Sequence, residues 1–180
     1  ETTFNLRRSR IDPRADLVLG DTGADRLPGG RGFDGVVLLG YHAMAGTPRA
    51  ILAHTCSSTW QRLWINGVES GEISVDAAYA GGEGLPVIMV SGDDKTCAEA
   101  KRVLPGVITA EVKKGLGREC GRLLSQRSAL ALIEARARTA ARRLAEFTPF
   151  RVGRPVRLRV ELVERQDLPP AAGKPFLKIM

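Results

Sequence analysis

The alternation of apolar and polar segments along the chain predicts strands and helices that follow one another from end to end. Two short apolar runs, at residues 33–40 and 85–90, have the composition of strands buried on both faces of a sheet. Residues 107–112 predict another strand, and residues 156–163 alternate apolar with charged side chains as a half-exposed strand does. A short strand is also expected at residues 15–19, within a polar N-terminal stretch.

Three segments carry the signals of helices: residues 73–80, a segment that ends near residue 104, and residues 126–147. Glu72 lies in the first turn of the first helix, which we expect to stop at Gly81-Gly82. Ser125 is suited to cap the third helix through its hydroxyl group. The pair Asp93-Asp94 could touch a substrate amine or a metal, but we favour the capping of the second helix, which such residues perform after a strand.

An Asn66-Gly67 pair separates two apolar runs, and this arrangement is the strongest short-range signal of a β-hairpin. Trp60 and Trp64 flank the hairpin and could line a peptide cleft, although packing is the commoner role of such a pair. Because strands and helices alternate, the predicted fold class is α/β, with a mainly parallel sheet flanked by helices in a single domain.

The composition limits the class of protein. The 180 residues are 43% hydrophobic, which suffices for the core of one domain. No apolar run reaches the ~20 residues of a membrane-spanning helix. The N-terminus lacks the pattern of a secretory signal, so either none existed or it has been removed, and we expect a cytoplasmic protein without a membrane partner. Cys56, Cys97 and Cys120 are odd in number and widely spaced, which suits a reducing compartment. We interpret them as small buried side chains, because no CxxC pair supports a zinc knuckle.

The net charge of +7 raises the question of nucleic-acid binding. Within the third predicted helix, arginines take one face and apolar residues the opposing one: Arg136, Arg138, Arg142 and Arg143 against Ile133, Ala137, Ala140 and Leu144. No aromatic residue before Phe147 is available there to stack on bases. The helix is therefore predicted to have a solvated basic face, and nucleic acid is not expected as a partner.

The candidate chemistry lies in the two histidines of the chain, His42 and His54. His42 follows a predicted strand, and active sites of α/β sheets collect at the carboxyl ends of their strands. Glu72 stands after a hairpin that could fold it back, and imidazole and carboxylate are both zinc ligands. From these residues alone the alternative stays open that the histidines are hydrogen-bonded interior residues and that Glu72 only complements the helix dipole.

Six segments, taken in order and spacing, carry a resemblance to one family. They are Gly40-Tyr41-His42-Ala43, Thr47-Pro48, Ala53-His54-Thr55, Ile65-Asn66-Gly67, Gly71-Glu72 and Val90-Ser91-Gly92-Asp93-Asp94. In combination they are similar to the zinc-dependent D-aminopeptidases associated with dipeptide-transport operons. We therefore expect one domain over residues 1–180, which comprises a partly loop segment at 1–32, the family core at 33–165 and a tail at 166–180 that is truncated relative to the family.

The resemblance implies an aminopeptidase that releases N-terminal D-amino acids from short peptides. It implies that His42 is a zinc ligand, that Glu72 bridges or terminates a pair of zinc ions, and that His54 is the catalytic histidine. Such metals polarise a peptide carbonyl and lower the pKa of a bound water, while His54 would act on the proton or stabilise the tetrahedral intermediate. The family also implies a ring-like homo-oligomer, a decamer, that encloses the active sites.

The chain departs from the family pattern at its beginning. Family members carry an Asp-x-Glu-Gly segment after their first strand and an Asp-x-His segment that would stand just before Glu1, and both supply metal ligands. Three explanations are open: the chain is a fragment, a separate N-terminal segment supplies those ligands, or catalysis has been lost. The last explanation gives the alternative function, a catalytically silent family member that acts as a peptide-binding or scaffold subunit.

Overall fold

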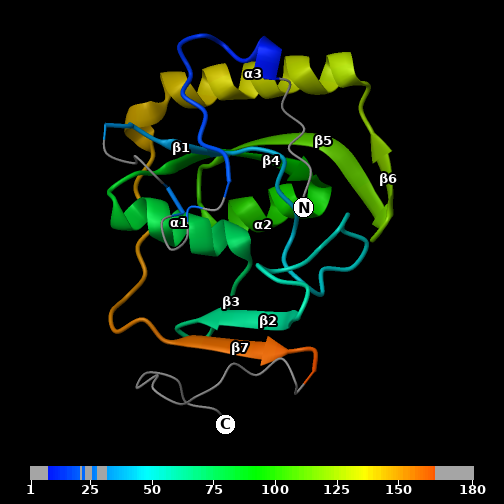
Figure 1. Ribbon diagram of the computed structural model, residues 1–180, viewed down its shortest axis with the longest axis vertical. Coiled ribbons are helices and arrows are strands. Elements are labelled where there is room, and N and C mark those ends of the chain that lie inside the picture. The colour runs from blue at the N-terminus through cyan, green and yellow to red at the C-terminus, as the bar shows by residue number, and fades with distance from the viewer. Residues whose placement is uncertain (1–7, 21, 23–25, 28–31, 165–180) are drawn as a thin grey trace.

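The computed structural model describes residues 8–20, 22, 26–27 and 32–164 of the chain. Its main sheet has the strand order β1-β4-β5-β6 (Figure 1). The strands are β1 (Val36–Leu38), β4 (Val87–Asp93), β5 (Ile108–Gly117) and β6 (Cys120–Leu123). β4 is parallel to both β1 and β5, and β6 is antiparallel to β5. The predicted mainly parallel sheet is therefore confirmed, and β6 is a strand that the sequence pattern did not predict.

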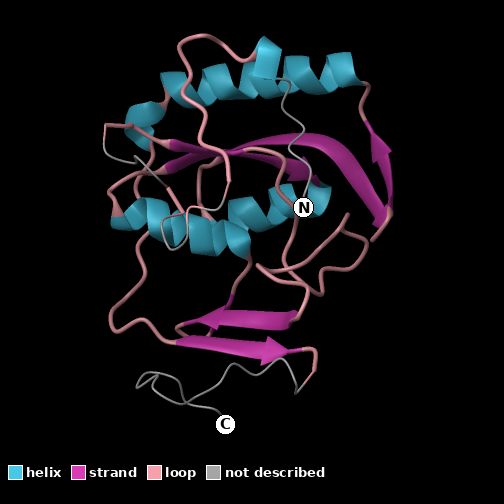
Figure 2. Cartoon of the chain, in the orientation of Figure 1, coloured by secondary structure: helices cyan, strands magenta, loops and turns pink. Residues whose placement is uncertain are grey.

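Helices cover the two faces of this sheet, as Figure 2 shows. α1 (Glu72–Gly82) and α2 (Asp94–Val103) lie on one face, and α3 (Gln126–Arg142) lies on the other. Short 3-10 turns occur at Arg8–Arg10 and Leu144–Glu146. All residues of β4 are buried between these layers, which explains why the strand begins with a continuous apolar run and not with an alternating pattern.

The third helix follows its predicted amphipathic pattern. Its apolar side packs on the main sheet through Ile133, Ala137 and Ala140, and Leu144 of the following 3-10 turn continues the spacing of three or four positions. Arg136, Arg138 and Arg142 are exposed, as expected for a solvated basic face. The Ser125 side chain caps the helix by accepting a hydrogen bond from the amide of Ser128 at 3.2 Å, as predicted.

A second, smaller sheet lies beyond α1 (Figure 1) and has the order β3-β2-β7. It consists of β2 (Trp60–Ile65), β3 (Val68–Glu69) and β7 (Leu158–Leu162), all antiparallel. Asn66 and Gly67 have φ angles of 49° and 84°, as both central residues of a tight hairpin turn require, so the predicted hairpin is confirmed. The Asn66 side chain also accepts a hydrogen bond from the Arg157 amide at 2.7 Å and so ties the turn to the approach of β7.

Three local predictions are wrong. Residues 15–19 form no strand, and the side chains of Leu17, Val18 and Leu19 are exposed. β1 is an edge strand among the described residues, with Val37 42% exposed, so it is not buried on both faces. Of the cysteines only Cys97 is buried. A run of apolar residues predicts a strand, but it cannot tell how many neighbours the strand will have.

The first helix ends at the Gly81-Gly82 pair, as predicted: Gly82 is its last residue, and Gly84, with a φ of 83°, follows its end. Gly81 also has a packing role. A Cβ atom at Gly81 would lie 1.8 Å from the carbonyl oxygen of Phe150, where the segment that leads to β7 crosses the helix.

No helix in the described residues is long and apolar enough to cross a membrane.

The two neighbouring glycines give a matched pair for a stability test. Gly81→Ala should lower the free energy of unfolding by about 1–3 kcal/mol, because the new methyl group would clash with the backbone of Phe150, which can move aside only by displacing its segment. Gly82→Ala has no atom within 4 Å of its Cβ and should leave that free energy unchanged or raise it by up to about 1 kcal/mol. Urea unfolding measures both variants, and equal effects would contradict the close approach of Phe150.

Candidate metal centre

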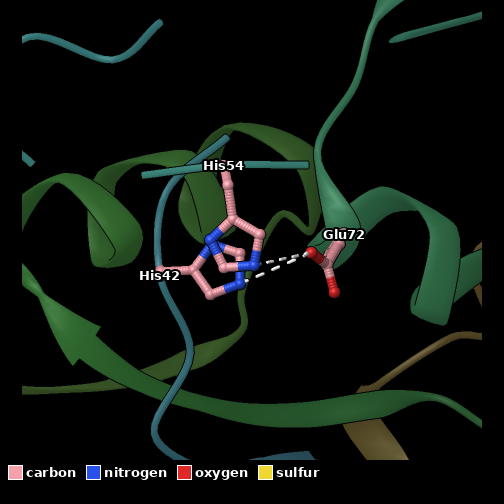
Figure 3. A group of neighbouring side chains, drawn as sticks. All are labelled: His42, His54 and Glu72. Carbon is pink, nitrogen blue, oxygen red and sulfur yellow. Dashed lines mark ion pairs between the residues drawn. The ribbon is translucent and has the colours of Figure 1, made fainter. Parts of the chain in front are cut away.

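The two histidines and Glu72 come together beside the carboxyl end of β4 (Figure 3). The segment after β1 is held along β4 by a hydrogen bond of 2.8 Å from the Tyr41 amide to the Ser91 carbonyl, and His42 is the next residue. His54 arrives on the following loop, and Glu72 stands in the first turn of α1. The sequence-based expectation that these three side chains meet is therefore met by the geometry.

The three side chains present their polar atoms to a common space. The Nε2 atoms of His42 and His54 each lie 3.5 Å from Oε1 of Glu72. All three side chains are only 13% to 17% exposed. One ligand atom from each residue lies within 4.8 Å of the other two, a spacing that can hold a metal ion.

Backbone contacts indicate which imidazole nitrogen carries the proton. Nδ1 of His42 lies 3.1 Å from the carbonyl oxygen of Ala43, and Nδ1 of His54 lies 2.7 Å from that of Leu52. A carbonyl oxygen only accepts hydrogen bonds, so these contacts favour the tautomer in which Nδ1 carries the proton, and that tautomer leaves Nε2 with a lone pair for a metal. Two such lone pairs face a carboxylate oxygen, and a cation bound in this space would relieve their mutual repulsion. Hydrogen bonds of this kind also orient histidines that bind metals.

The donor set fits zinc in type and in spacing. Zinc is bound by imidazole nitrogen and carboxylate oxygen at about 2.0–2.1 Å, so tetrahedral ligands lie about 3.3 Å from one another. The observed separations of 3.5 Å from each histidine to Glu72 match that value. The two imidazole rings are stacked, with centroids 3.7 Å apart and planes 19° from parallel. The Nε2 atoms of the two histidines thus approach the same oxygen, Oε1 of Glu72, at equal distances.

Contacts from β4 and the β5–β6 turn hold the loop that carries His54. The Asp93 carboxylate accepts a hydrogen bond from the Ile51 amide at 2.8 Å. The Arg118 guanidinium donates to the carbonyl of Ala53 at 2.6 Å, and the Arg118 carbonyl accepts from the Leu52 amide at 2.8 Å. Leu52 has a φ of 52°, in the left-handed region that residues other than glycine rarely adopt, so the surrounding contacts must maintain this backbone conformation.

Glu72 is held from two sides. Its Oε1 accepts a hydrogen bond from the Cys56 amide at 2.7 Å, and Arg26 approaches its other oxygen at 3.9 Å. Asp76, one turn further along α1, accepts from Arg26 at 2.5 Å and from the hydroxyl of Tyr41. Burial and the Asp76 carboxylate raise the pKa of Tyr41 well above its usual value, so the hydroxyl stays a neutral donor. Asp76 is therefore engaged, and Glu72 is the α1 carboxylate that faces the histidines.

Several residues around the centre escaped the sequence analysis. Arg26, Asp76 and Arg118 lie in a loop, on a helix face and in a turn, and no local pattern brings them together. Cys56 borders the centre, but partial desolvation of its thiol and the Glu72 carboxylate raise its pKa to about 11, so it is a neutral thiol and not a thiolate ligand. The preference for Asp93 as a helix cap is confirmed, because its carboxylate accepts from the Thr96 amide at 2.8 Å.

The double role of Asp93 gives a stability prediction. Asp93→Ala removes the cap of α2 and leaves the Ile51 amide without its acceptor, so the free energy of unfolding should fall by about 2–4 kcal/mol. Ser125→Ala is the matched control, because Ser125 caps α3 at an exposed site and should cost only about 1 kcal/mol. Chemical denaturation measures both, and a cost at Asp93 no larger than that at Ser125 would refute the link to the His54 loop.

Comparisons with known proteins show the family of the chain. The profile of the D-aminopeptidase family of peptidases matches residues 1–177 of the chain. A D-aminopeptidase of Bacillus subtilis (strain 168) is 36% identical over 139 residues, which cover 71% of this chain and 50% of that protein. A solved structure described as "Zn-dependent D-aminopeptidase DppA from Bacillus subtilis, a self-compartmentalizing protease" matches with a TM-score of 0.80 at 30% identity, over 89% of this chain and 59% of that one. The chain thus spans about half the length of the curated relative, and it belongs to the D-aminopeptidase family.

Proposed function

We propose that the protein is a zinc-dependent aminopeptidase that releases N-terminal D-amino acids from short peptides. One observation carries this proposal: His42, His54 and Glu72 converge with two imidazole lone pairs aimed at a carboxylate. Membership of the D-aminopeptidase family and the zinc dependence of the solved relative support the same chemistry.

His42 and Glu72 are the proposed metal ligands of this chain. The Ala43 carbonyl orients the His42 ring, and the Cys56 amide orients the Glu72 carboxylate, so both donors are fixed before a metal arrives. Zinc, when bound, supplies Lewis acidity that polarises a carbonyl group and lowers the pKa of a water molecule. We propose two zinc ions per site, in keeping with the family resemblance, with Glu72 as a ligand that would bridge or terminate the pair and with further ligands from outside these three residues.

His54 is the proposed catalytic histidine. Its Nδ1 donates to the Leu52 carbonyl, which leaves Nε2 able to take a proton and, once protonated, to donate to a negatively charged oxygen. The side chain is 17% exposed, so it is not sealed off from solvent. Asp93 and Arg118 fix the loop in which it sits, and this rigidity favours proton transfer at a defined point.

We also propose that the protein assembles into a ring-like homo-oligomer, a decamer, that encloses its active sites. The solved relative is described as a self-compartmentalizing protease, and this description supports the proposal. Sedimentation of the complete gene product measures the assembly. A cytoplasmic location stays a prediction from the sequence.

The proposed roles predict that loss of a metal ligand lowers zinc affinity, whereas loss of the catalytic histidine lowers turnover and leaves the zinc content unchanged. His42→Ala and Glu72→Gln should lower zinc affinity by about tenfold or more, because each removes a ligand. His54→Ala should keep the zinc content of the parent protein and lower kcat by about 10²–10⁴-fold, because only proton transfer is lost. Elemental analysis after dialysis gives the zinc content, and hydrolysis of D-alanyl peptides gives kcat.

Glu69→Gln, on the small sheet, is the matched control for a change of carboxylate to amide, and it should alter neither quantity. Loss of zinc in His54→Ala would contradict the assignment of separate roles. A complete gene product that binds little zinc and cleaves no D-aminoacyl peptide would instead favour the catalytically silent subunit.

A further inference from the structure

A cavity of about 510 Å³ lies between α1 and the small sheet. Figure 1 shows the small sheet on the side of α1 that faces away from the main sheet. Apolar and aromatic side chains from both elements line the cavity, among them Trp60 and Leu63 of β2 and Val75 and Ala78 of α1. Its volume falls within the range of roughly 300–1,000 Å³ that is common for small-molecule sites.

The helix has two apolar faces with separate uses. Ile73, Ala77 and Ala80 are fully buried in the core beneath the main sheet. Val75, Ala78 and Gly82 recur at spacings of three and four and face the cavity instead. The cavity is therefore apolar space outside the core of the main sheet.

One end of the cavity reaches the candidate metal centre. Cys56 and Arg26 both belong to the cavity wall. The Cys56 amide donates to Glu72 at 2.7 Å, and the Arg26 guanidinium lies 3.9 Å from the same carboxylate. A molecule with one end at Glu72 would therefore extend into this cavity.

Two arginines place positive charge on another part of the cavity wall. Arg151 and Arg154, from the segment that leads to β7, line the cavity and are exposed. Neither forms an ion pair with another described residue. A carboxylate is the natural ligand of such a guanidinium group, because the two match in charge and in hydrogen-bond geometry.

We propose that this cavity binds the part of a short peptide that follows the N-terminal residue, with an apolar side chain against Trp60 and Ala78. The carboxyl terminus of the peptide pairs with Arg151 and Arg154. This assignment rests on the proposed function, since it places the N-terminal residue at Glu72. It makes the preferred substrate a peptide of a few residues with an apolar second residue and a free carboxyl terminus.

The fluorescence of Trp60, which lines the cavity, can report binding there. The chain has two tryptophans, of which Trp60 lines the cavity and Trp64 stacks under the Arg159 guanidinium at 4.1 Å. Trp64→Phe leaves Trp60 as the sole tryptophan of these 180 residues. The matching Trp60→Phe variant measures any fluorescence that does not come from the cavity. Combined with His54→Ala in the complete gene product loaded with zinc, the Trp64→Phe variant reports binding without turnover.

The first experiment titrates this variant with D-alanyl-D-leucine, with D-alanyl-glycine and with the amide of D-alanyl-D-leucine. Trp60 fluorescence should saturate with the leucine peptide, and the Kd should rise by about tenfold or more when leucine is replaced by glycine. The amide should also bind about tenfold more weakly, because it lacks the charge that the arginines pair with. Equal Kd values for all three ligands would overturn the inference.

The second experiment changes the cavity itself. Ala78→Phe fills the cavity and should abolish the preference for leucine over glycine, whereas Ala131→Phe, on the exposed face of α3, should keep it. Arg151→Gln with Arg154→Gln, both at exposed positions, should make acid and amide bind alike and does not depend on the folding of Ala78→Phe. An unchanged acid preference in that double variant would overturn the assignment of the carboxylate site.

Turnover by the unsubstituted protein separates the two proposals. If it hydrolyses D-alanyl peptides but Ala78→Phe and the arginine variants leave its KM values for all of them unchanged, the cavity is not the peptide site and the proposed function stands. If it hydrolyses none of them, the proposed function fails, while selective quenching of Trp60 by the leucine peptide still supports the cavity as a peptide-binding site.

Discussion

The arrangement of this protein depends on the buried carboxylate of Asp93. This side chain is 0% exposed and sits at the junction of β4 and α2, where it caps the helix and also accepts from the Ile51 amide. The central strand, the helix that covers it and the loop of His54 are thereby joined through one group. A buried carboxylate is stable only when its oxygens are hydrogen-bonded, so the requirement to satisfy Asp93 fixes the loop.

The electrostatic arrangement on α1 follows from two carboxylates one turn apart. Asp76 is 7% exposed and is occupied by Arg26 and Tyr41. Glu72, at the helix N-terminus, has one oxygen on the Cys56 amide and faces the two histidines. Arg26 is shared between the carboxylates, and it offsets part of the negative charge that two acids would otherwise accumulate beside an apolar core.

The same helix joins the candidate metal centre to the rest of the molecule. Its N-terminal turn supplies Glu72, one face packs on the main sheet, and another face lines the cavity toward the small sheet. Gly81 lets the segment after α3 cross the helix at close range, and that segment then leads to β7. The position of α1 therefore sets both the metal centre and the shape of the space beside it.

Local patterns in the sequence determined the elements and their chemistry. The buried strand at β4, the Asn66-Gly67 hairpin and the capped helix α3 follow from side-chain periodicity and turn chemistry, which act over a few residues. The order of short motifs also indicated the family and the three residues of the candidate centre. Only the tertiary structure decided that β1 is an edge strand among the described residues, that Asp76 pairs with Arg26, and that the His54 loop is held by Arg118. These features arise from contacts between residues that are distant along the chain, and no local pattern of apolar and polar positions encodes such contacts.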